Sequence, residues 1–220
     1  MKKIAKRLSN VYSLLRDWAI IFYLFRITKD TRNTQTPVKF KHWFVQKIIG
    51  KNREAYWPVH PNSVVRGAKN IFAGVETSPG YESGCYIQAI NSIYIGDYTQ
   101  IASNVGIISA NHSSKDLRIQ VSGKPIRIGK YCWVGMGVII LPEVELGDFT
   151  IVGAGSVVTK SFPEGYCIIA GNPAKKIKQL TREECVMHKS ENEYNGFYRS
   201  SDKFKKYSRK YLNIEISNYE

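Results

Sequence analysis

The chain has 220 residues, a length that suits one main domain with terminal additions. Its formal net charge of +14 favours an anionic partner, such as a phosphate group or an acidic membrane surface. No zinc-finger spacing, basic zipper or RNA-stacking motif accompanies this charge, which argues against nucleic acid as the partner.

The cysteine content and the apolar runs limit the class of protein further. The four cysteines are far apart and form no Cys-x-x-Cys pair, so we expect buried apolar thiols and a reducing, cytoplasmic compartment. The longest apolar run at the N-terminal end, Trp18–Phe25, is much shorter than the roughly twenty residues that a spanning helix needs.

Residues 1–60 are expected to form an N-terminal region that consists of a helix and a connector. Over residues 1–30, apolar residues recur at alternating spacings of three and four: Leu8, Val11, Leu15, Trp18, Phe22 and Phe25. Lysines and arginines supply a basic side to this amphipathic helix. Two interpretations stay open: the helix lies on an anionic membrane, or it packs on its own solenoid or on a neighbouring subunit. Residues 31–60 read as a connector, with His60 at a turn before Pro61.

A period of six residues dominates the middle of the chain. An aliphatic residue recurs at Ile128, Val134, Ile140, Leu146, Val152 and Val158, and a shorter run occurs at Ile95, Ile101 and Ile107. Neither a helix nor an ordinary strand has this period, but a chain that turns a corner every six residues does. Three corners close a triangular coil, so we predict a mainly β solenoid in which residues eighteen apart stack. Ile128 should then lie on Leu146, and Val134 on Val152.

The largest interruption of this period follows His112. The count stops there and restarts near Ile126, so residues 113–125 are predicted to form a loop. The chain has four histidines, and His112 is the one placed at this interruption. A neutral imidazole at the edge of a cleft can act as a general base. On spacing alone, a surface histidine without a catalytic role stays an open alternative.

The period ends after Val158, and residues 179–220 are expected to form a helical tail. Gly171-Asn172-Pro173 reads as a turn. Thr181 and Glu184 have the spacing of a capping box, which predicts a helix that starts near residue 182.

Four short motifs extend the interpretation beyond the solenoid. They are Asn104-Val105 before His112, Cys132-Trp133-Val134-Gly135 after the loop, Gly153-Ala154-Gly155-Ser156-Val157-Val158-Thr159-Lys160, and Ala170-Gly171-Asn172-Pro173-Ala174-Lys175. In this order they resemble the hexapeptide-repeat acetyltransferases of the maltose, galactoside and xenobiotic type. Within that group the chain looks most like enzymes that O-acetylate bacterial surface polysaccharides.

The resemblance covers residues 64–178 and implies a fold and an assembly. The fold would be a left-handed parallel β-helix over residues 61–178, with N-terminal and C-terminal helical extensions. Members of this family are typically homotrimers with an active site in each inter-subunit cleft, and the loop that matches 113–125 usually projects over the neighbouring subunit.

The resemblance also implies roles for individual residues. His112 would be the general base that activates a sugar hydroxyl for direct attack on acetyl-CoA, with no acyl-enzyme and no metal. The residues that match CoA-binding positions are Trp133, Gly135, Met136, Ala154, Thr159, Lys160, Lys175 and Lys178. Asn104 and Gln88 match polar residues on the acceptor side.

Several functional alternatives stay open at this point. The N-terminus is longer and more basic than in the maltose and galactoside enzymes, which favours a large or lipid-linked glycan at the inner face of a membrane. An amino-sugar acceptor would make the enzyme an N-acetyltransferase. A zinc hydratase of the γ-carbonic anhydrase type needs three imidazoles, whereas the regular solenoid offers one. A non-catalytic trimeric scaffold is the remaining alternative.

Overall fold

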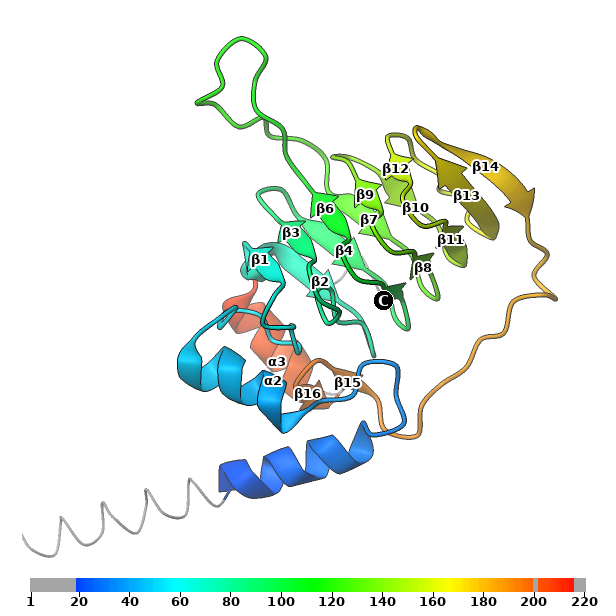
Figure 1. Ribbon diagram of the computed structural model, residues 1–220. Coiled ribbons are helices and arrows are strands. Elements are labelled where there is room, and N and C mark those ends of the chain that lie inside the picture. The colour runs from blue at the N-terminus through cyan, green and yellow to red at the C-terminus, as the bar shows by residue number, and fades with distance from the viewer. Residues whose placement is uncertain (1–18, 200–201, 216–220) are drawn as a thin grey trace, which may run out of the picture.

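The computed structural model describes residues 19–199 and 202–215, and its centre is a three-sided coil of short parallel strands (Figure 1). Face 1 consists of β1 (Val64–Arg66), β3 (Tyr86–Gln88), β6 (Gly106–Ile108), β9 (Ile139–Ile140) and β12 (Val157–Val158). Face 2 consists of β2 (Ile71–Ala73), β4 (Ile93–Ile95), β7 (Ile126–Ile128) and β10 (Glu145–Leu146). Face 3 consists of β5 (Gln100–Ile101), β8 (Trp133–Val134), β11 (Thr150–Val152), β13 (Cys167–Gly171) and the antiparallel β14 (Ala174–Gln179).

The strand register confirms the predicted stacking of residues eighteen apart. Leu146 pairs with Ile128, Val152 with Val134, and Val158 with Ile140. The inward aliphatic side chains form one continuous buried core, which also includes the thiols of Cys85, Cys132 and Cys167. Burial of this apolar stack supplies the main stabilisation, about 25 cal/mol for each Å² removed from water.

The coil continues in register on both sides of the long loop. Ile95 pairs with Ile128 on face 2, and Ile107 pairs with Ile140 on face 1, although residues 113–125 lie between the partners in sequence. The loop therefore leaves the coil and returns to it without changing which residues point inward (Figure 1).

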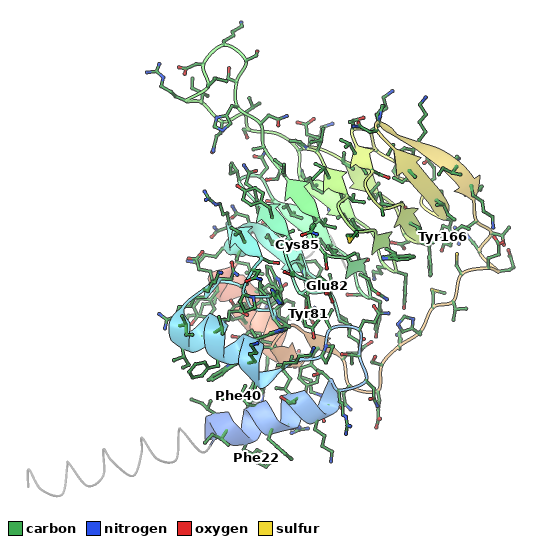
Figure 2. The ribbon with its side chains drawn as sticks, viewed as in Figure 1. Phe22, Phe40, Tyr81, Glu82, Cys85 and Tyr166 are labelled. Carbon is green, nitrogen blue, oxygen red and sulfur yellow. The ribbon has the colours of Figure 1, made fainter. Side chains whose placement is uncertain are left out.

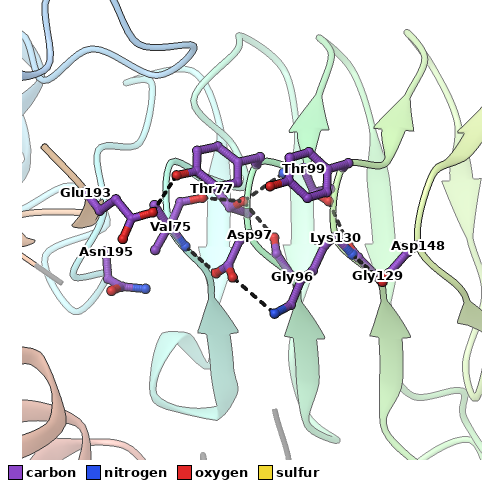
Figure 3. Close-up of polar contacts among 12 residues, drawn as sticks. Val75, Thr77, Gly96, Asp97, Thr99, Gly129, Lys130, Asp148, Glu193 and Asn195 are labelled. Carbon is purple, nitrogen blue, oxygen red and sulfur yellow. Dashed lines mark hydrogen bonds and ion pairs between the residues drawn. The ribbon is translucent and has the colours of Figure 1, made fainter. Parts of the chain in front are cut away.

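Polar side chains connect successive coils at the corner between faces 2 and 3 (Figure 3). Thr77 and Thr99 donate hydrogen bonds from Oγ1 to the carbonyls of Gly96 and Gly129 in the next coil, at 2.8 and 2.7 Å. Asp97 accepts from the N–H of Val75 at 2.8 Å and lies 3.4 Å from Nζ of Lys130. These bonds satisfy backbone groups that the sharp corner leaves without a strand partner.

The same corner carries a ladder of aromatic rings, formed by Tyr98, Tyr131, Phe149 and Tyr166. Each of these residues has a positive φ, between 47° and 57°, and successive ring centroids are 4.9–5.2 Å apart. Non-glycine residues seldom adopt this conformation, and the stacking of the rings offsets part of its cost.

A helical cap covers the first coil. It contains helical residues 19–30, α2 (Phe40–Phe44), the π-helical turn η1 (Val45–Ile49), the hairpin β15 (Tyr194–Asn195) and β16 (Tyr198–Arg199), and α3 (Asp202–Tyr211), whereas the 3₁₀ turn η2 (Ala68–Asn70) is the corner of the first coil between β1 and β2. Phe204 of α3 packs on Tyr56, whose hydroxyl donates to the carbonyl of Ala73 at 2.9 Å. Both ends of the described chain therefore meet at the same end of the coil (Figure 1).

The predicted N-terminal helix is present over residues 19–30, and the rest of the prediction falls outside the described residues. Leu24 and Ile27 face inward and are buried, whereas Phe22 and Phe25 are 69% and 71% exposed. These two members of the predicted stripe thus point away from the body, as Figure 2 shows for Phe22. The helix has two apolar faces, one packed on the protein and one exposed in the single chain.

Two predictions about helices need correction. The connector over residues 31–60 contains α2 and η1, which are short and have no side-chain cap at their N-termini. No helix starts near residue 182: Thr181 and Glu184 exchange capping-box hydrogen bonds, but the chain then runs on without regular structure. The helix of the C-terminal region is α3, twenty residues later.

The segment that replaces the expected helix, residues 180–193, returns along the aromatic ladder from the last coil to the cap (Figure 1). Arg182 lies over the ring of Tyr166, and the hydroxyl of Tyr131 donates to the carbonyl of His188. Further along, the hydroxyl of Tyr98 donates to Glu193 at 2.7 Å. These long-range contacts outweigh the local helix signal.

Candidate active site

His112 lies at the end of the β6 segment, where the chain leaves the coil, and its side chain is exposed. Its Nδ1 lies 2.6 Å from the carbonyl oxygen of Leu117. A carbonyl oxygen only accepts hydrogen bonds, so Nδ1 must carry the hydrogen. In the neutral ring this hydrogen bond puts the lone pair on Nε2, which is the tautomer that a general base requires.

The loop that holds Leu117 is closed on itself by backbone hydrogen bonds. The N–H of Ser113 donates to the carbonyl of Ile119 at 2.8 Å, and the N–H of Val121 donates to the carbonyl of Asn111 at 2.9 Å. Asp116 is close to His112 in sequence, but its carboxylate pairs with Arg118 at 2.8–2.9 Å. This pairing lowers the pKa of Asp116 and engages the carboxylate away from the imidazole.

Side chains from the neighbouring coil support the start of the loop. Oε1 of Gln88 accepts from the N–H of Ala110 at 3.3 Å, so this predicted acceptor-side residue does lie beside the strand that leads to His112. Nδ2 of Asn91 donates to the carbonyl of Ser109 at 2.8 Å. Sequence reasoning did not identify Asn91, because an asparagine in a tight turn has no feature that distinguishes this supporting role.

Four of the predicted site residues lie along the corner between faces 3 and 1. Asn104 occupies the left-handed region at this corner with a φ of 61°, and Gly137 and Gly155 occupy equivalent positions in the later coils at 70° and 69°. The N–H of Gly155 donates to the carbonyl of Met136 at 2.8 Å, which places Met136 above Ala154. At Gly135 a Cβ atom would lie 2.7 Å from the carbonyl oxygen of Val152, so only glycine permits this spacing.

Trp133 on β8 lies next to this corner and presents an apolar surface to solvent. Its side chain is 55% exposed, and that of Met136 is 58% exposed. Trp133 borders a cavity of about 240 Å³, which is also lined by Tyr81, Gln100 and Ser103. His112 does not line this cavity.

The remaining predicted residues are distributed over other surfaces. Thr159 and Lys160 are exposed at the corner that follows β12, between faces 1 and 2, which is also the corner from which the His112 loop departs. Lys175 and Lys178 are exposed on β14. Within one chain, face 1 therefore separates His112 from Trp133, and the two residues do not share a groove.

The other chemically reactive groups are positioned differently. Burial raises the pKa of the Cys132 thiol to about 12, and burial also raises the pKa values of Cys85 and Cys167. In the described part of the chain, no three histidine, cysteine or acidic side chains are grouped so that they could hold a metal ion.

Comparison with known proteins identifies the class. Residues 125–160 match the family described as bacterial transferase hexapeptide (six repeats). A Saccharomyces cerevisiae protein with a provisional acetyltransferase name is 40% identical over 173 residues, which cover 73% of this chain and 86% of that protein. An Escherichia coli protein, provisionally named an O-acetyl transferase of lipopolysaccharide biosynthesis, is 37% identical over 118 residues, which cover 48% of this chain and 59% of that protein.

The fold is shared with solved members of the class. A maltose O-acetyltransferase from Clostridium difficile superposes with a TM-score of 0.50 and 27% identity, over 73% of this chain and 86% of that one. With several sequence relatives, the match spans between 53% and 59% of the relative's length.

The chain belongs to the hexapeptide-repeat acetyltransferases. It is an acyltransferase with the left-handed β-helix of that family, and the fold class and the resemblance predicted from its sequence are confirmed.

Proposed function

We propose that the protein is an acetyl-CoA-dependent O-acetyltransferase that acylates a hydroxyl of a bacterial surface saccharide or of its precursor, with His112 as the general base. The observation that carries this proposal is the hydrogen bond between Nδ1 of His112 and the carbonyl of Leu117, which leaves Nε2 free of hydrogen at an exposed position. The saccharide class is supported by the lipopolysaccharide relative of E. coli.

The reaction is a direct transfer in one ternary complex. The acceptor hydroxyl oxygen attacks the thioester carbonyl carbon while Nε2 of His112 takes the hydroxyl proton. Collapse of the tetrahedral intermediate breaks the C–S bond, and the imidazolium returns the proton to the departing sulfur to give free CoA. The Leu117 carbonyl holds the ring orientation and favours the transient imidazolium, because it accepts from Nδ1–H in both protonation states.

The exposed strip of Trp133, Met136 and Ala154 suits the pantetheine arm of CoA. Its apolar side chains can cover the methylene groups of the arm, and the absence of a side chain at Gly135 keeps the coils close and the surface open. Thr159, Lys160, Lys175 and Lys178 would contact phosphate groups through charge-assisted hydrogen bonds. Asn104 and Gln88 would face the acceptor.

A homotrimer would bring the two halves of this site together. His112 and Trp133 lie at different corners of one chain, so a groove that contains both requires a second chain. The loop supports this arrangement, because Leu117 at its tip is 74% exposed and Ile119 and Val121 are exposed beside it. Each loop would then carry its His112 toward the Trp133 strip of a neighbour.

The decisive experiment follows CoA thiol release with saccharide acceptors in His112→Ala. We expect the rate to fall about a hundredfold or more with CoA affinity unchanged, since one general base typically contributes this much. His188→Ala is the matched control, because it removes an exposed imidazole at the aromatic ladder. Equal rates in wild type and His112→Ala would exclude His112 from proton transfer. Loss of the product acetyl group in mild alkali would identify an ester rather than an amide.

Peripheral contact of residues 1–30 with an anionic membrane at the inner face is part of the same proposal. Residues 1–53 contain 13 lysines and arginines and 2 aspartates, a net +11 within the total of +14. In the range that the structure describes, no helix combines the length and the apolarity needed to cross a bilayer. The exposed rings of Phe22 and Phe25 suit insertion to the depth of the headgroups.

Vesicle sedimentation tests this contact. Phe22→Ser with Phe25→Ser should weaken binding to phosphatidylglycerol-containing vesicles about tenfold or more, because two apolar side chains can then no longer be buried. Val186→Ser with Met187→Ser removes exposed apolar surface outside the cap and should have no effect. Equal binding by both double variants would disprove a membrane role for the helix.

A further inference from the structure

The cap encloses a second cavity, of about 450 Å³, in addition to the one beside Trp133. It lies where helical residues 19–30, α2, η1, the β15–β16 hairpin and α3 meet. Each of its eleven lining residues is either aromatic or basic: Tyr23, Arg26, Trp43, Lys47, Tyr56, Tyr194, Phe197, Tyr198, Arg199, Lys203 and Tyr207. The volume is within the usual range of small-molecule sites, roughly 300–1,000 Å³.

The aromatic walls are held in place by hydrogen bonds at their hydroxyl groups. Tyr23 donates to the carbonyl of Phe197, Tyr56 donates to the carbonyl of Ala73, and Tyr194 donates to Asp30 at 2.7 Å. Tyr198 and Tyr207 stack with their ring centroids 4.4 Å apart. A bound molecule would therefore meet ring faces that are already ordered, which lowers the entropic cost of binding.

The charge of the lining is positive at physiological pH. Burial raises the pKa of Tyr23, Tyr194 and Tyr207 to about 12, so these phenols stay neutral. Asp30 lies behind the wall, where it accepts from Tyr194 and lies 3.7 Å from Arg26. Four basic side chains line the cavity, and such a lining suits a ligand with a phosphate.

The pKa of Lys47 reflects the burial and the positive charge of this part of the cap. Its ammonium group donates to the carbonyls of Arg53 and Ala55 at 2.9 and 2.8 Å, which fixes it at the cavity wall. Burial and the nearby Arg53 lower its pKa to about 8. A bound anion would offset this penalty on the charged form.

We propose that the cap cavity binds a sugar phosphate, with the C–H faces of the sugar ring on the aromatic walls and the phosphate among Arg26, Lys47, Arg199 and Lys203. Aromatic rings provide amphipathic contact area for such a ring, and arginine and lysine bind phosphate through charge-assisted hydrogen bonds. The site would recognise either a free sugar phosphate or the same group presented on a lipid. It is separate from the His112 and Trp133 surfaces and does not depend on the proposed reaction.

Binding is measured on the full chain by calorimetry, with glucose 1-phosphate as the free probe and no CoA present. Inorganic phosphate has the phosphate group without the sugar, and methyl glucoside has the sugar without the phosphate. Each should bind at least about tenfold more weakly than glucose 1-phosphate. For the lipid source, vesicles that contain phosphatidylinositol are compared with vesicles that contain the same fraction of phosphatidylserine. Binding of either form of sugar phosphate supports the site, and the pair of measurements identifies its source.

The cavity is tested by Arg26→Gln with Lys203→Gln, against the matched control Lys29→Gln with Lys206→Gln. Both pairs remove two charges from the same two helices, but Lys29 and Lys206 are exposed and do not line the cavity. We expect affinity to fall at least about tenfold in the first variant and less than twofold in the control. Lys203→Glu alone is a second test: it should also lower the affinity, and it leaves the pairing of Arg26 with Asp30 intact.

Three results would overturn the proposal. One is an equal loss of affinity in the cavity variant and its control, which would indicate diffuse electrostatic attraction. Another is the absence of glucose 1-phosphate binding together with equal affinity for the two kinds of vesicle. The third is tighter binding of uridine monophosphate than of glucose 1-phosphate, which would assign the aromatic walls to a nucleobase.

Discussion

The orientation of His112 comes from a backbone carbonyl rather than from a carboxylate. The position of His112 could be predicted, because the repeat stops at that residue. Its partner could not, since the carbonyl of Leu117 has no side-chain signature and reaches Nδ1 only through the turn of the loop. The nearest acid in sequence, Asp116, is paired with Arg118 instead. Residue types thus indicate which groups can react, whereas the loop geometry decides how they are oriented.

His42 in the cap makes the stability sensitive to acid. It is buried between the rings of His60 and Tyr81, and Nδ1 has no hydrogen-bond partner among the described residues. Burial, followed by the charges of Lys39, His60 and Lys41, lowers its pKa. The unfolded chain therefore takes up the proton first, and the free energy of unfolding falls as the pH drops below about 6.5.

Thermal unfolding between pH 7.5 and 5.0 checks this prediction. The melting temperature of His42→Phe should fall less between pH 7.5 and 5.0 than that of wild type, because phenylalanine cannot take up a proton in the folded or the unfolded state. His188→Phe, which changes an exposed histidine, should follow the wild-type slope. If the melting temperature of His42→Phe depended on pH as strongly as that of wild type, the acid sensitivity would arise from other groups.

At the scale of elements, the loop is an insertion that the coil does not need. Because Ile107 and Ile140 pair across it in register, replacement of residues 114–124 by a short glycine-serine turn should leave the coil folded. Loop length has a weak effect on stability, about 0.6 kcal/mol for each doubling, so we expect a melting temperature within about 4 °C of wild type. Acetyl transfer should be lost, because Leu117 no longer fixes His112. Unfolding of this variant would show that the loop contributes to the core.

The accuracy of prediction differs between the coil and the cap for a physical reason. In the coil each hexad repeats one contact, so the same register is encoded many times, as with Ile128 on Leu146. In the cap each contact occurs once and joins distant segments, as with Phe204 on Tyr56. The capping box at Thr181 shows the limit of a local signal: its hydrogen bonds form, and no helix follows.

At the scale of the whole molecule, the candidate site was predicted as a set of residues but not as one place. Asn104, Met136 and Ala154 do share a corner, because residues at equivalent positions of successive coils must stack. His112 leaves the coil at a different corner, and nothing in a hexad pattern states how neighbouring chains would be arranged. The repeats of a solenoid specify the cross-section of its coil far more strongly than they specify the arrangement of neighbouring chains.

The return segment, residues 180–193, should make the ends of the solenoid unfold together. Repeat proteins commonly lose their terminal repeats first, because each repeat contacts only its neighbours. Here the contacts of Arg182, His188 and Glu193 connect the last coil to the cap. Hydrogen exchange should therefore show similar opening free energies for β1 and β13 in the full chain and different ones after Tyr131→Phe with Tyr98→Phe, which removes the hydroxyl contacts to His188 and Glu193. Unequal protection already in the full chain would refute this coupling.

The length of the same segment is related to the number of turns in the solenoid. One end of the segment is attached to the last coil and the other to the cap, so the segment has to span the height of the solenoid. Each added turn would lengthen the prism by about 4.8 Å, which is the reach of between one and two extended residues. A duplication of eighteen residues would move the last coil one turn further from the cap, so residues 180–193 would have to extend or shift their contacts with the aromatic ladder.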